Sequence, residues 1–221
     1  SQKKIKLSKK TFKQKIYTHS HNYQKSLKLN KNKILKNYIV FVDQAIPGHP
    51  DYKNSIDNDP FDRKYYYKSI NKVLEELGNK YNKKIIIAGH PKNYQNKSKI
   101  NFNFPVYFFR TSNLIKNSYL VVNHISTSID FAVIFKKPII FVTDKNIKKY
   151  DPPLHHQIIL NANFFRMPLI EMSSNHKLNS NDIIINSNKY KKYFDYFIKH
   201  PKSKNINIWD DYLKYLRKKN N

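Results

Sequence analysis

The sequence predicts an α/β domain with a doubly wound, Rossmann-like parallel sheet and additional C-terminal helices. Short, uninterrupted apolar runs recur along the chain, as in parallel strands that are buried on both faces. Segments with helical spacing of apolar residues separate these runs, and such alternation gives a parallel sheet with helices on both sides. Right-handed crossovers then complete the doubly wound topology.

Five strands and three helices are expected in the first two thirds of the chain. The apolar runs that predict strands lie at 38–43, 85–88, 106–109, 119–122 and 138–142. The helical spacing predicts helices at 65–77, 113–117 and 127–135. The tail is expected to add a helix near 155–163, a strand at 182–185, and helices near 187–199 and 206–218.

The composition suggests one main domain with an extension. Residues 1–37 are polar, strongly basic and almost without apolar periodicity, so we expect a basic N-terminal arm or linker there. Residues 38–221 are expected to form one Rossmann-like nucleotide-binding domain that includes the C-terminal helices. No apolar run approaches the roughly 20 residues that span a bilayer, and no apolar signal core is present.

The formal net charge of +27 arises from 42 Lys and Arg residues against 15 Asp and Glu. Such a charge attracts polyanions and anionic membrane surfaces. The Lys residues are scattered, and neither an Arg-rich groove-reading helix nor an RNP-type aromatic strand occurs, which disfavours nucleic acid as the partner. We therefore expect a cytoplasmic protein that rests on the inner membrane, and a basic nucleic-acid-binding protein stays open as an alternative.

Polar residues follow three of the expected strands. Because the carboxyl ends of parallel strands meet at one edge of a sheet, the three loops are expected to converge on one ligand site. The residues concerned are Asp43, then His90 and Pro91, and then His124 with Ser126, Thr127 and Ser128. Hydroxyl groups and free N–H groups at the start of a helix suit a phosphate, whereas the simpler alternative is that Ser126 only caps the helix.

Several enzyme classes are disfavoured by missing motifs. The chain has no Cys and only three Gly, and it has no P-loop, no dinucleotide fingerprint and no nucleophile elbow. The loop from Asp43 through His49 to Asp51 has the residue types of an acid–base or metal cluster, or of a turn held by side-chain hydrogen bonds. No His/carboxylate spacing matches a zinc hydrolase, so neither a metal nor another cofactor is expected.

Two segments resemble bacterial transferases. Residues 118–143, SYLVVNHISTSIDFAVIFKKPIIFVT, run from a polar strand end through a Ser/Thr pair and an apolar helix to Lys-Pro and a buried strand. This block resembles part of the donor pocket of GT-B-type transferases such as the CDP-glycerol glycerophosphotransferases of teichoic-acid synthesis. Residues 85–94, IIIAGHPKNY, resemble the HP motif of bacterial sialyl- and polysialyltransferases. Together the resemblance covers roughly residues 38–145.

The resemblance implies the C-terminal, donor-binding half of a surface-polysaccharide transferase that serves capsule or lipopolysaccharide synthesis. It implies that His90 contacts the donor phosphate or base, that Ser126, Thr127 and Ser128 contact phosphate oxygens, and that Asp130 reaches a ribose hydroxyl. Pro91 and His124 would lie in the same pocket. The donor would be CMP- or CDP-linked, with UDP as a further candidate, and the acceptor a glycan or a lipid-linked glycan.

The catalytic groups are less well defined than the donor site. In the families that the chain resembles, the base often lies in an N-terminal domain, for which this sequence has no clear equivalent. Asp43, His49 and His90 are our candidates within this chain. Two other functions stay open, a non-catalytic module that binds a nucleotide sugar or glycan, and a nucleotide-sugar epimerase.

Overall fold

A computed structural model describes residues 17–29, 37–49, 60–174 and 180–219 of the chain. In these residues six parallel strands form one sheet in the order β3-β2-β1-β4-β5-β6, which is the strand order of the Rossmann fold. The expected fold class is therefore confirmed. The strands are β1 (Tyr38–Val42), β2 (Lys84–Gly89), β3 (Val106–Phe108), β4 (Leu120–Asn123), β5 (Ile139–Thr143) and β6 (Leu169–Glu171).

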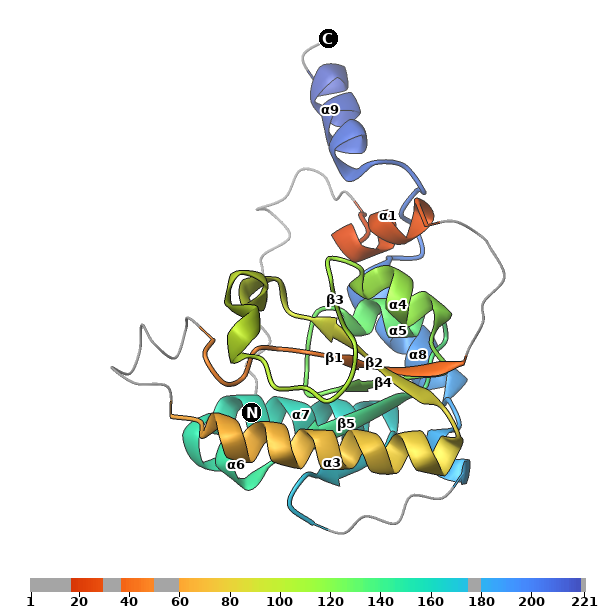
Figure 1. Cartoon of the computed structure of the whole chain (residues 1–221). Coiled ribbons are helices and arrows are strands. Elements are labelled where there is room, and N and C mark those ends of the chain that lie inside the picture. The colour runs from red at the N-terminus through yellow and green to blue at the C-terminus, as the bar shows by residue number, and fades with distance from the viewer. Residues whose placement is uncertain (1–16, 30–36, 50–59, 175–179, 220–221) are drawn as a thin grey trace.

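The helices connect the strands and enclose the sheet (Figure 1). The α-helices are α1 (His21–Leu27), α3 (Arg63–Tyr81), α4 (Thr111–Asn117), α5 (Ile129–Ile134), α6 (Lys145–Tyr150), α7 (Pro152–Phe165), α8 (Ser187–Tyr193) and α9 (Ile208–Lys219). The described residues also include two 3-10 helices, η1 (Pro91–Lys99) and η2 (Ser180–Ile183), and a π-helix, η3 (Phe194–Ile198).

The register of the strands assigns the helices to two faces. Phe41 pairs with Val122 in the neighbouring strand, and its ring lies 5.7 Å from that of His124, which in turn contacts Tyr66 of α3. Side chains one position further along a strand point to the opposite face. There the ring of Phe141 stacks at 6.3 Å on Phe165 of α7. Both faces are thus covered, which accounts for the continuous apolar runs in the sequence.

A capping aspartate at one end and a left-handed residue at the other mark the bounds of the long helix α3. The carboxylate of Asp62 accepts a hydrogen bond of 3.1 Å from the backbone N–H of Tyr65 and caps the first turn. The helix ends at Asn82, which has the left-handed conformation (φ 49°) that terminates many helices. It therefore continues past residue 77, where the sequence predicted its end.

The tail differs from the sequence-based expectation in one strand. Residues 182–185 were expected to form a strand, but η2 covers 180–183 and is no part of the sheet. The sixth strand is instead β6, which pairs with β5 through Val142 and Ile170. A run of three isoleucines fits a strand or a turn equally well, so the packing against β5 distinguishes the two segments. The expected helices near 155–163, 187–199 and 206–218 are present, the second of them continuing into η3.

The described part of the N-terminal extension packs on the domain. Residues 21–27 form α1, which lies against α5, and an antiparallel bridge joins His19 to Lys199. Asn22 donates a hydrogen bond of 2.9 Å to the carbonyl oxygen of Thr127. Within the described residues, every helix is too short or too polar to cross a bilayer.

Replacing Gly89 tests the packing of the edge strand. A Cβ atom at Gly89 would lie 2.7 Å from the Phe108 ring and 2.8 Å from Val106, so Gly89→Ala should displace β3. We expect a loss of about 1–3 kcal/mol in the free energy of unfolding, measured by urea denaturation. Gly78→Ala is the control, since its Cβ would come no closer than 3.1 Å and alanine favours a helix. Equal stabilities for the two variants would contradict the packing.

Candidate functional site

Asp43 holds the loop after β2 against the end of β1. Its carboxylate is 3% exposed and accepts three hydrogen bonds from N–H groups. One oxygen accepts from the backbone of Ala45 at 2.8 Å, and the other from the backbone of His90 at 3.1 Å and from the side chain of Asn93 at 2.9 Å. With its oxygens engaged in this way, Asp43 positions the His90 loop and is not placed to act as a base.

Gln44 makes the corresponding connection on the other side of β1. Its side-chain oxygen accepts a hydrogen bond of 2.6 Å from the backbone N–H of Ile125, in the loop after β4. The strand order reverses between β1 and β4, and this topological switch point is where ligands bind in sheets of this kind. Consecutive residues at the end of β1 thus hold the loops that follow both neighbouring strands, β2 and β4.

His90 forms a cluster with His49 and Lys92. The two imidazole rings meet edge to face with centroids 5.7 Å apart, and the Lys92 ammonium lies 3.2 Å from Nε2 of His49. Nδ1 of His90 accepts the backbone N–H of Lys92 at 3.3 Å, so the neutral ring carries its proton on Nε2. Burial lowers the pKa of His90, with His49 and Lys92 adding to the effect and Asp43 opposing it. The cluster therefore offers hydrogen-bond donors and positive charge to an anion.

A cavity of about 1170 Å³ opens at the switch point. Its polar lining comes from Gln44, Ser126 and Thr127 at the strand ends and from amide side chains of α7. Its apolar lining combines three aliphatic and three aromatic side chains. The remaining residues of the lining are Ile125, Ile129, Gln157, Leu160, Asn161, Asn163, Phe164, Tyr193 and Phe197. Hydroxyl, amide and aromatic groups in one concave surface suit a ligand with phosphate, hydroxyl and ring components.

The turn before α5 supplies donors to this cavity. Thr127 is exposed, Ser126 and Ser128 are half-buried, and Ser126 Oγ accepts the backbone N–H of Ser128 at 3.2 Å. Within the described part of the chain, the backbone N–H groups of Ser126 and Thr127 have no hydrogen-bond partner. Since α5 has only six residues, attraction for an anion rests on these groups and the hydroxyls more than on a helix dipole.

His124 lies inside the core, contrary to the expectation that it lines the donor pocket. It is 0% exposed, Nδ1 donates to the Val142 carbonyl at 2.8 Å, and Nε2 lies 2.8 Å from the hydroxyl of Tyr66. Burial lowers the pKa of His124 to about 4, so the ring is neutral at physiological pH. With both nitrogens engaged in the core, its role is structural: it joins β4 to β5 and α3.

The carboxylate of Asp130 accepts hydrogen bonds from two other side chains of the domain, and Asp130 does not line the cavity. One oxygen accepts a hydrogen bond of 3.1 Å from Asn22 of α1, and the other accepts one of 3.2 Å from the hydroxyl of Tyr193. Burial raises the pKa of Asp130, and these hydrogen bonds partly offset the rise. Because Tyr193 lines the cavity, Asp130 shapes the site by positioning that ring rather than by reaching a ribose itself.

The structure also brings in residues that the sequence analysis missed. Gln157, Asn161 and Phe164 lie at positions i, i+4 and i+7 of α7 and share the helix face that borders the cavity. That spacing of amides within an otherwise apolar helix is visible in the sequence and is a usable signal. Tyr193 and Phe197, by contrast, arrive from α8 and η3, and no local pattern points to them.

The remaining expected residues divide between two places. Asp43, His49, His90 and Pro91 lie around the end of β2, whereas Ser126 and Thr127 line the cavity and Ser128 does not. The Asp43-Gln44 pair connects the two groups. Pro50 and Asp51 lie outside the described residues. Among the residues that are described, no three His, Asp or Glu side chains gather as a metal site would require.

Comparison with known proteins gives distant similarities. No model of a known family matches the sequence, and no curated protein matches it. Among solved structures, the UDP-GlcNAc 2-epimerase of Methanocaldococcus jannaschii in complex with UDP-GlcNAc and UDP is similar over 79% of this chain and 52% of that one, with 16% identity and a TM-score of 0.35. The glycotransferase of kitacinnamycin is similar over 66% of this chain and 33% of that one, with 10% identity and a TM-score of 0.35.

The chain spans about half the length of the epimerase that it resembles.

Buried His124 should make the stability of the domain fall with decreasing pH. The unfolded chain binds a proton on this ring below about pH 6.5, whereas the folded chain does so only near pH 4, so protonation favours unfolding in that window. The full effect is about 3 kcal/mol. We expect His124→Gln to be less stable at pH 7 and to lose less stability between pH 7 and pH 4.5, measured by urea denaturation.

The exposed residue His156 provides the control, because His156→Gln should keep the pH dependence of the parent. Parallel stability curves for His124→Gln and the parent would show that the ring is not buried in its neutral form.

Proposed function

We propose that the chain is the donor-binding part of a glycosyltransferase or glycerophosphotransferase that uses a nucleotide-activated donor for surface-glycan synthesis. The observation that carries the proposal is the cavity at the switch point between β1 and β4, with Ser126 and Thr127 on one side and aromatic rings on the other. Donors of this type combine a base, a ribose and phosphates, and the lining offers a complementary group for each.

The donor would lie across the end of β1. Its phosphates would accept hydrogen bonds from the hydroxyls and free N–H groups at Ser126 and Thr127, and its base would stack on a ring such as Phe164. Gln157 and Asn161 would bind ribose hydroxyls or the edge of the base. A cytidine nucleotide is the favoured donor component, on the resemblance of residues 85–94 and 118–143 to transferases that use CMP- and CDP-linked donors.

His90 would act on the leaving phosphate. β2 and β4 lie on either side of β1, so their ends are roughly 10 Å apart, which a nucleotide-activated sugar can bridge. As the bond from the transferred group to phosphate breaks, negative charge grows on the phosphate, and the Nε2–H of His90 with the Lys92 ammonium would stabilise it. His49 would complete this cationic cluster, and Asp43 would hold it in place.

Nucleotide binding is the first test. Isothermal titration calorimetry of the chain with CMP, CDP, UDP and GDP should show binding, tightest for a cytidine nucleotide. Ser126→Ala and Gln44→Ala should each weaken binding about tenfold, since each removes one hydrogen-bonding group from the site. Ser187→Ala, in a separate cavity of about 510 Å³, is the control that should bind as the parent does. Absence of binding to all four nucleotides at millimolar concentration would refute the donor site.

Turnover is the second test, and it separates a transferase from a non-catalytic binding module. With a CMP- or CDP-linked donor and a lipid-linked acceptor, His90→Ala should lower kcat about 100-fold, the typical effect of removing one donor to a developing anion. The affinity for the free nucleotide should change much less, because the base and ribose contacts are kept. His156→Ala provides the control. Nucleotide binding without any turnover would favour the binding module, and interconversion of sugar epimers would favour an epimerase.

A further inference from the structure

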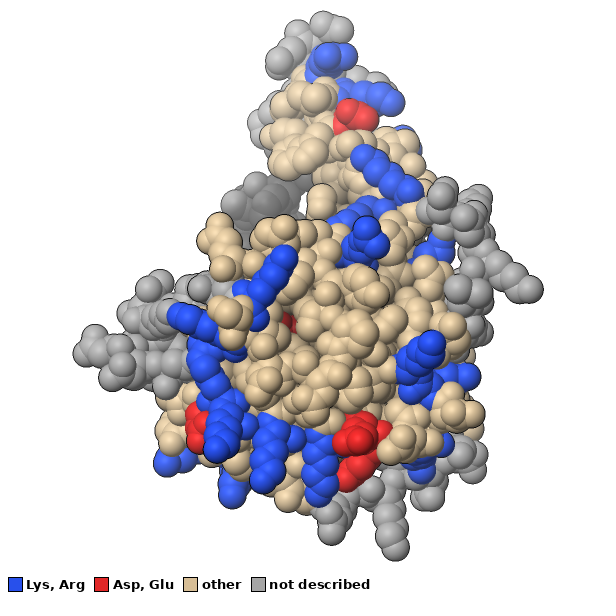
Figure 2. Space-filling model, in the orientation of Figure 1, with Lys and Arg blue, Asp and Glu red and all other residues tan. Residues whose placement is uncertain are grey.

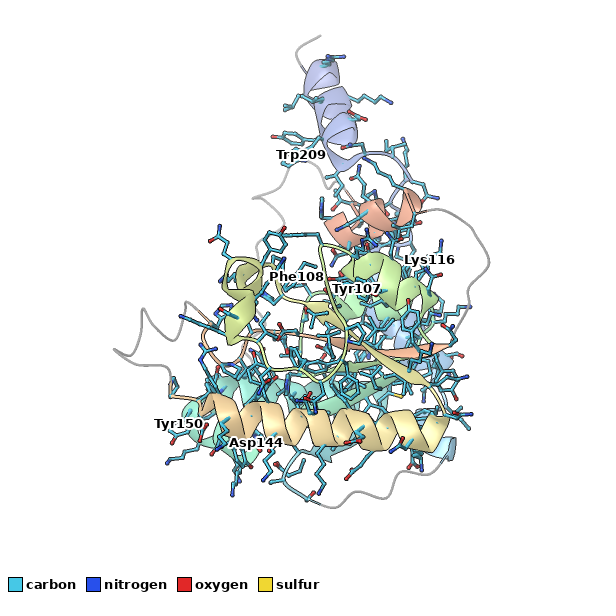
Figure 3. All side chains as sticks on the ribbon, in the orientation of Figure 1. Tyr107, Phe108, Lys116, Asp144, Tyr150 and Trp209 are labelled. Atoms are coloured by element: carbon cyan, nitrogen blue, oxygen red, sulfur yellow. The ribbon has the colours of Figure 1, made fainter. Side chains whose placement is uncertain are left out.

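The C-terminal helix α9 stands away from the domain. Figure 1 shows it projecting beyond the layers of the sheet and its covering helices, and Figure 3 shows Trp209 at its first turn, clear of the domain. Trp209 is 71% exposed, and Tyr212 and Leu213 are exposed as well. A tryptophan in this position is unusual, because its large apolar ring is normally covered by protein or by another apolar phase.

Four apolar side chains of α9, three of them exposed and that of Leu216 half-buried, lie on one face of the helix. Trp209, Tyr212, Leu213 and Leu216 occupy positions i, i+3, i+4 and i+7, which fall on one side of an α-helix. Lys214 and Arg217 lie on other sides, and Figure 2 shows basic side chains along this helix. Over residues 199–219 the sequence holds seven Lys and Arg residues and two Asp, a net charge of +5.

The segment before α9 is fixed to the domain. Nε2 of His19 lies 2.8 Å from the carbonyl oxygen of Ile206, and the hydroxyl of Tyr23 donates to the Asn205 side chain at 3.1 Å. The Asn207 side chain then accepts the backbone N–H of Trp209 at 2.9 Å and caps the helix start. α9 therefore begins at a defined place, next to α1.

We propose that α9 binds an anionic lipid surface and lies in the plane of the membrane interface. A helix of 12 residues is about 18 Å long, too short for a hydrocarbon core of about 30 Å, so it lies along the surface. Its apolar face enters the boundary between headgroups and acyl chains, where tryptophan and tyrosine are favoured. Lys214 and Arg217 then remain at the level of the anionic headgroups.

Charge and length favour lipid over other occupants of this face. A second copy of the chain would bring together two bodies of formal charge +27, and a helix of fewer than two heptads is short for a coiled coil. A nucleic acid would satisfy the basic side chains but offers no apolar interior to Leu213 and Leu216. An anionic lipid surface satisfies both faces of the helix.

This attachment would also place the donor cavity near the membrane, a consequence that rests on the proposed function. Tyr193 and Phe197 line the cavity, and the chain runs from them through residues 199–207 directly into α9. A lipid-linked acceptor diffuses in the membrane plane, so α9 would keep the donor site at the surface where that acceptor is found.

The single tryptophan of the chain allows a direct test, because Trp209 fluorescence reports on α9 alone. The 221-residue chain is titrated with vesicles of phosphatidylcholine alone or of phosphatidylcholine with phosphatidylglycerol. We expect a blue shift of the emission with the anionic vesicles only, and weaker binding at higher salt. Leu213→Glu should weaken binding at least tenfold, since it removes a buried leucine and adds a negative charge.

Ile184→Glu is the matched control, because Ile184 is an exposed apolar residue outside α9 and this change should leave vesicle binding intact. Leu213→Glu should bind nucleotides in solution as the parent does, so failure of the membrane proposal and failure of the donor site are distinguishable. No shift with anionic vesicles would overturn the proposal. Equal vesicle binding by Leu213→Glu and the parent would also overturn it. So would a blue shift of the Trp209 emission without vesicles, produced either by raising the protein concentration or by adding single-stranded RNA.

Discussion

The arrangement of the site depends on the hydrogen bonds that Asp43 and Gln44 make directly after β1. Asp43 accepts from the loop that follows β2, and Gln44 accepts from the loop that follows β4. A buried carboxylate is costly unless it is fully hydrogen-bonded, and Asp43 recovers this cost through three N–H donors. The positions of the two loops therefore depend on the hydrogen bonds of Asp43 and Gln44.

Two chemically different groups of side chains lie along the carboxyl edge of the sheet. The histidine and lysine cluster around His90 offers donors and positive charge, whereas the cavity beside Ser126 offers hydroxyls, amides and aromatic rings. A nucleotide-activated donor has an anionic middle and an aromatic end, and it would need both. At this edge the Lys92 ammonium supplies positive charge, whereas the ring of His124 is held neutral by burial.

The fold was largely predictable because its strands are buried on both faces. Five of the six strands appear in the sequence as continuous apolar runs, and order and chirality rules then lead to the observed topology. The sixth, β6, was missed because its three residues follow Pro168 with no long apolar run of their own, whereas the three isoleucines at 183–185 begin at the last residue of η2 and lie outside the sheet. Strand propensity does not predict which of these two segments joins the sheet, because the contact with β5 determines it.

The sequence by itself determined the fold class and the edge of the sheet at which polar residues gather, and it pointed to the Ser126-Thr127 turn, which lines the cavity. These follow from local patterns, since strand ends and turns can be recognised from a few consecutive residues. Only the tertiary structure decided that His124 and Asp130 form hydrogen bonds with other residues of the domain, that Asp43 positions a loop, and that residues of α7, α8 and η3 line the cavity. The direction in which a side chain points and its burial depend on residues far away in the chain, so a local sequence pattern does not predict them.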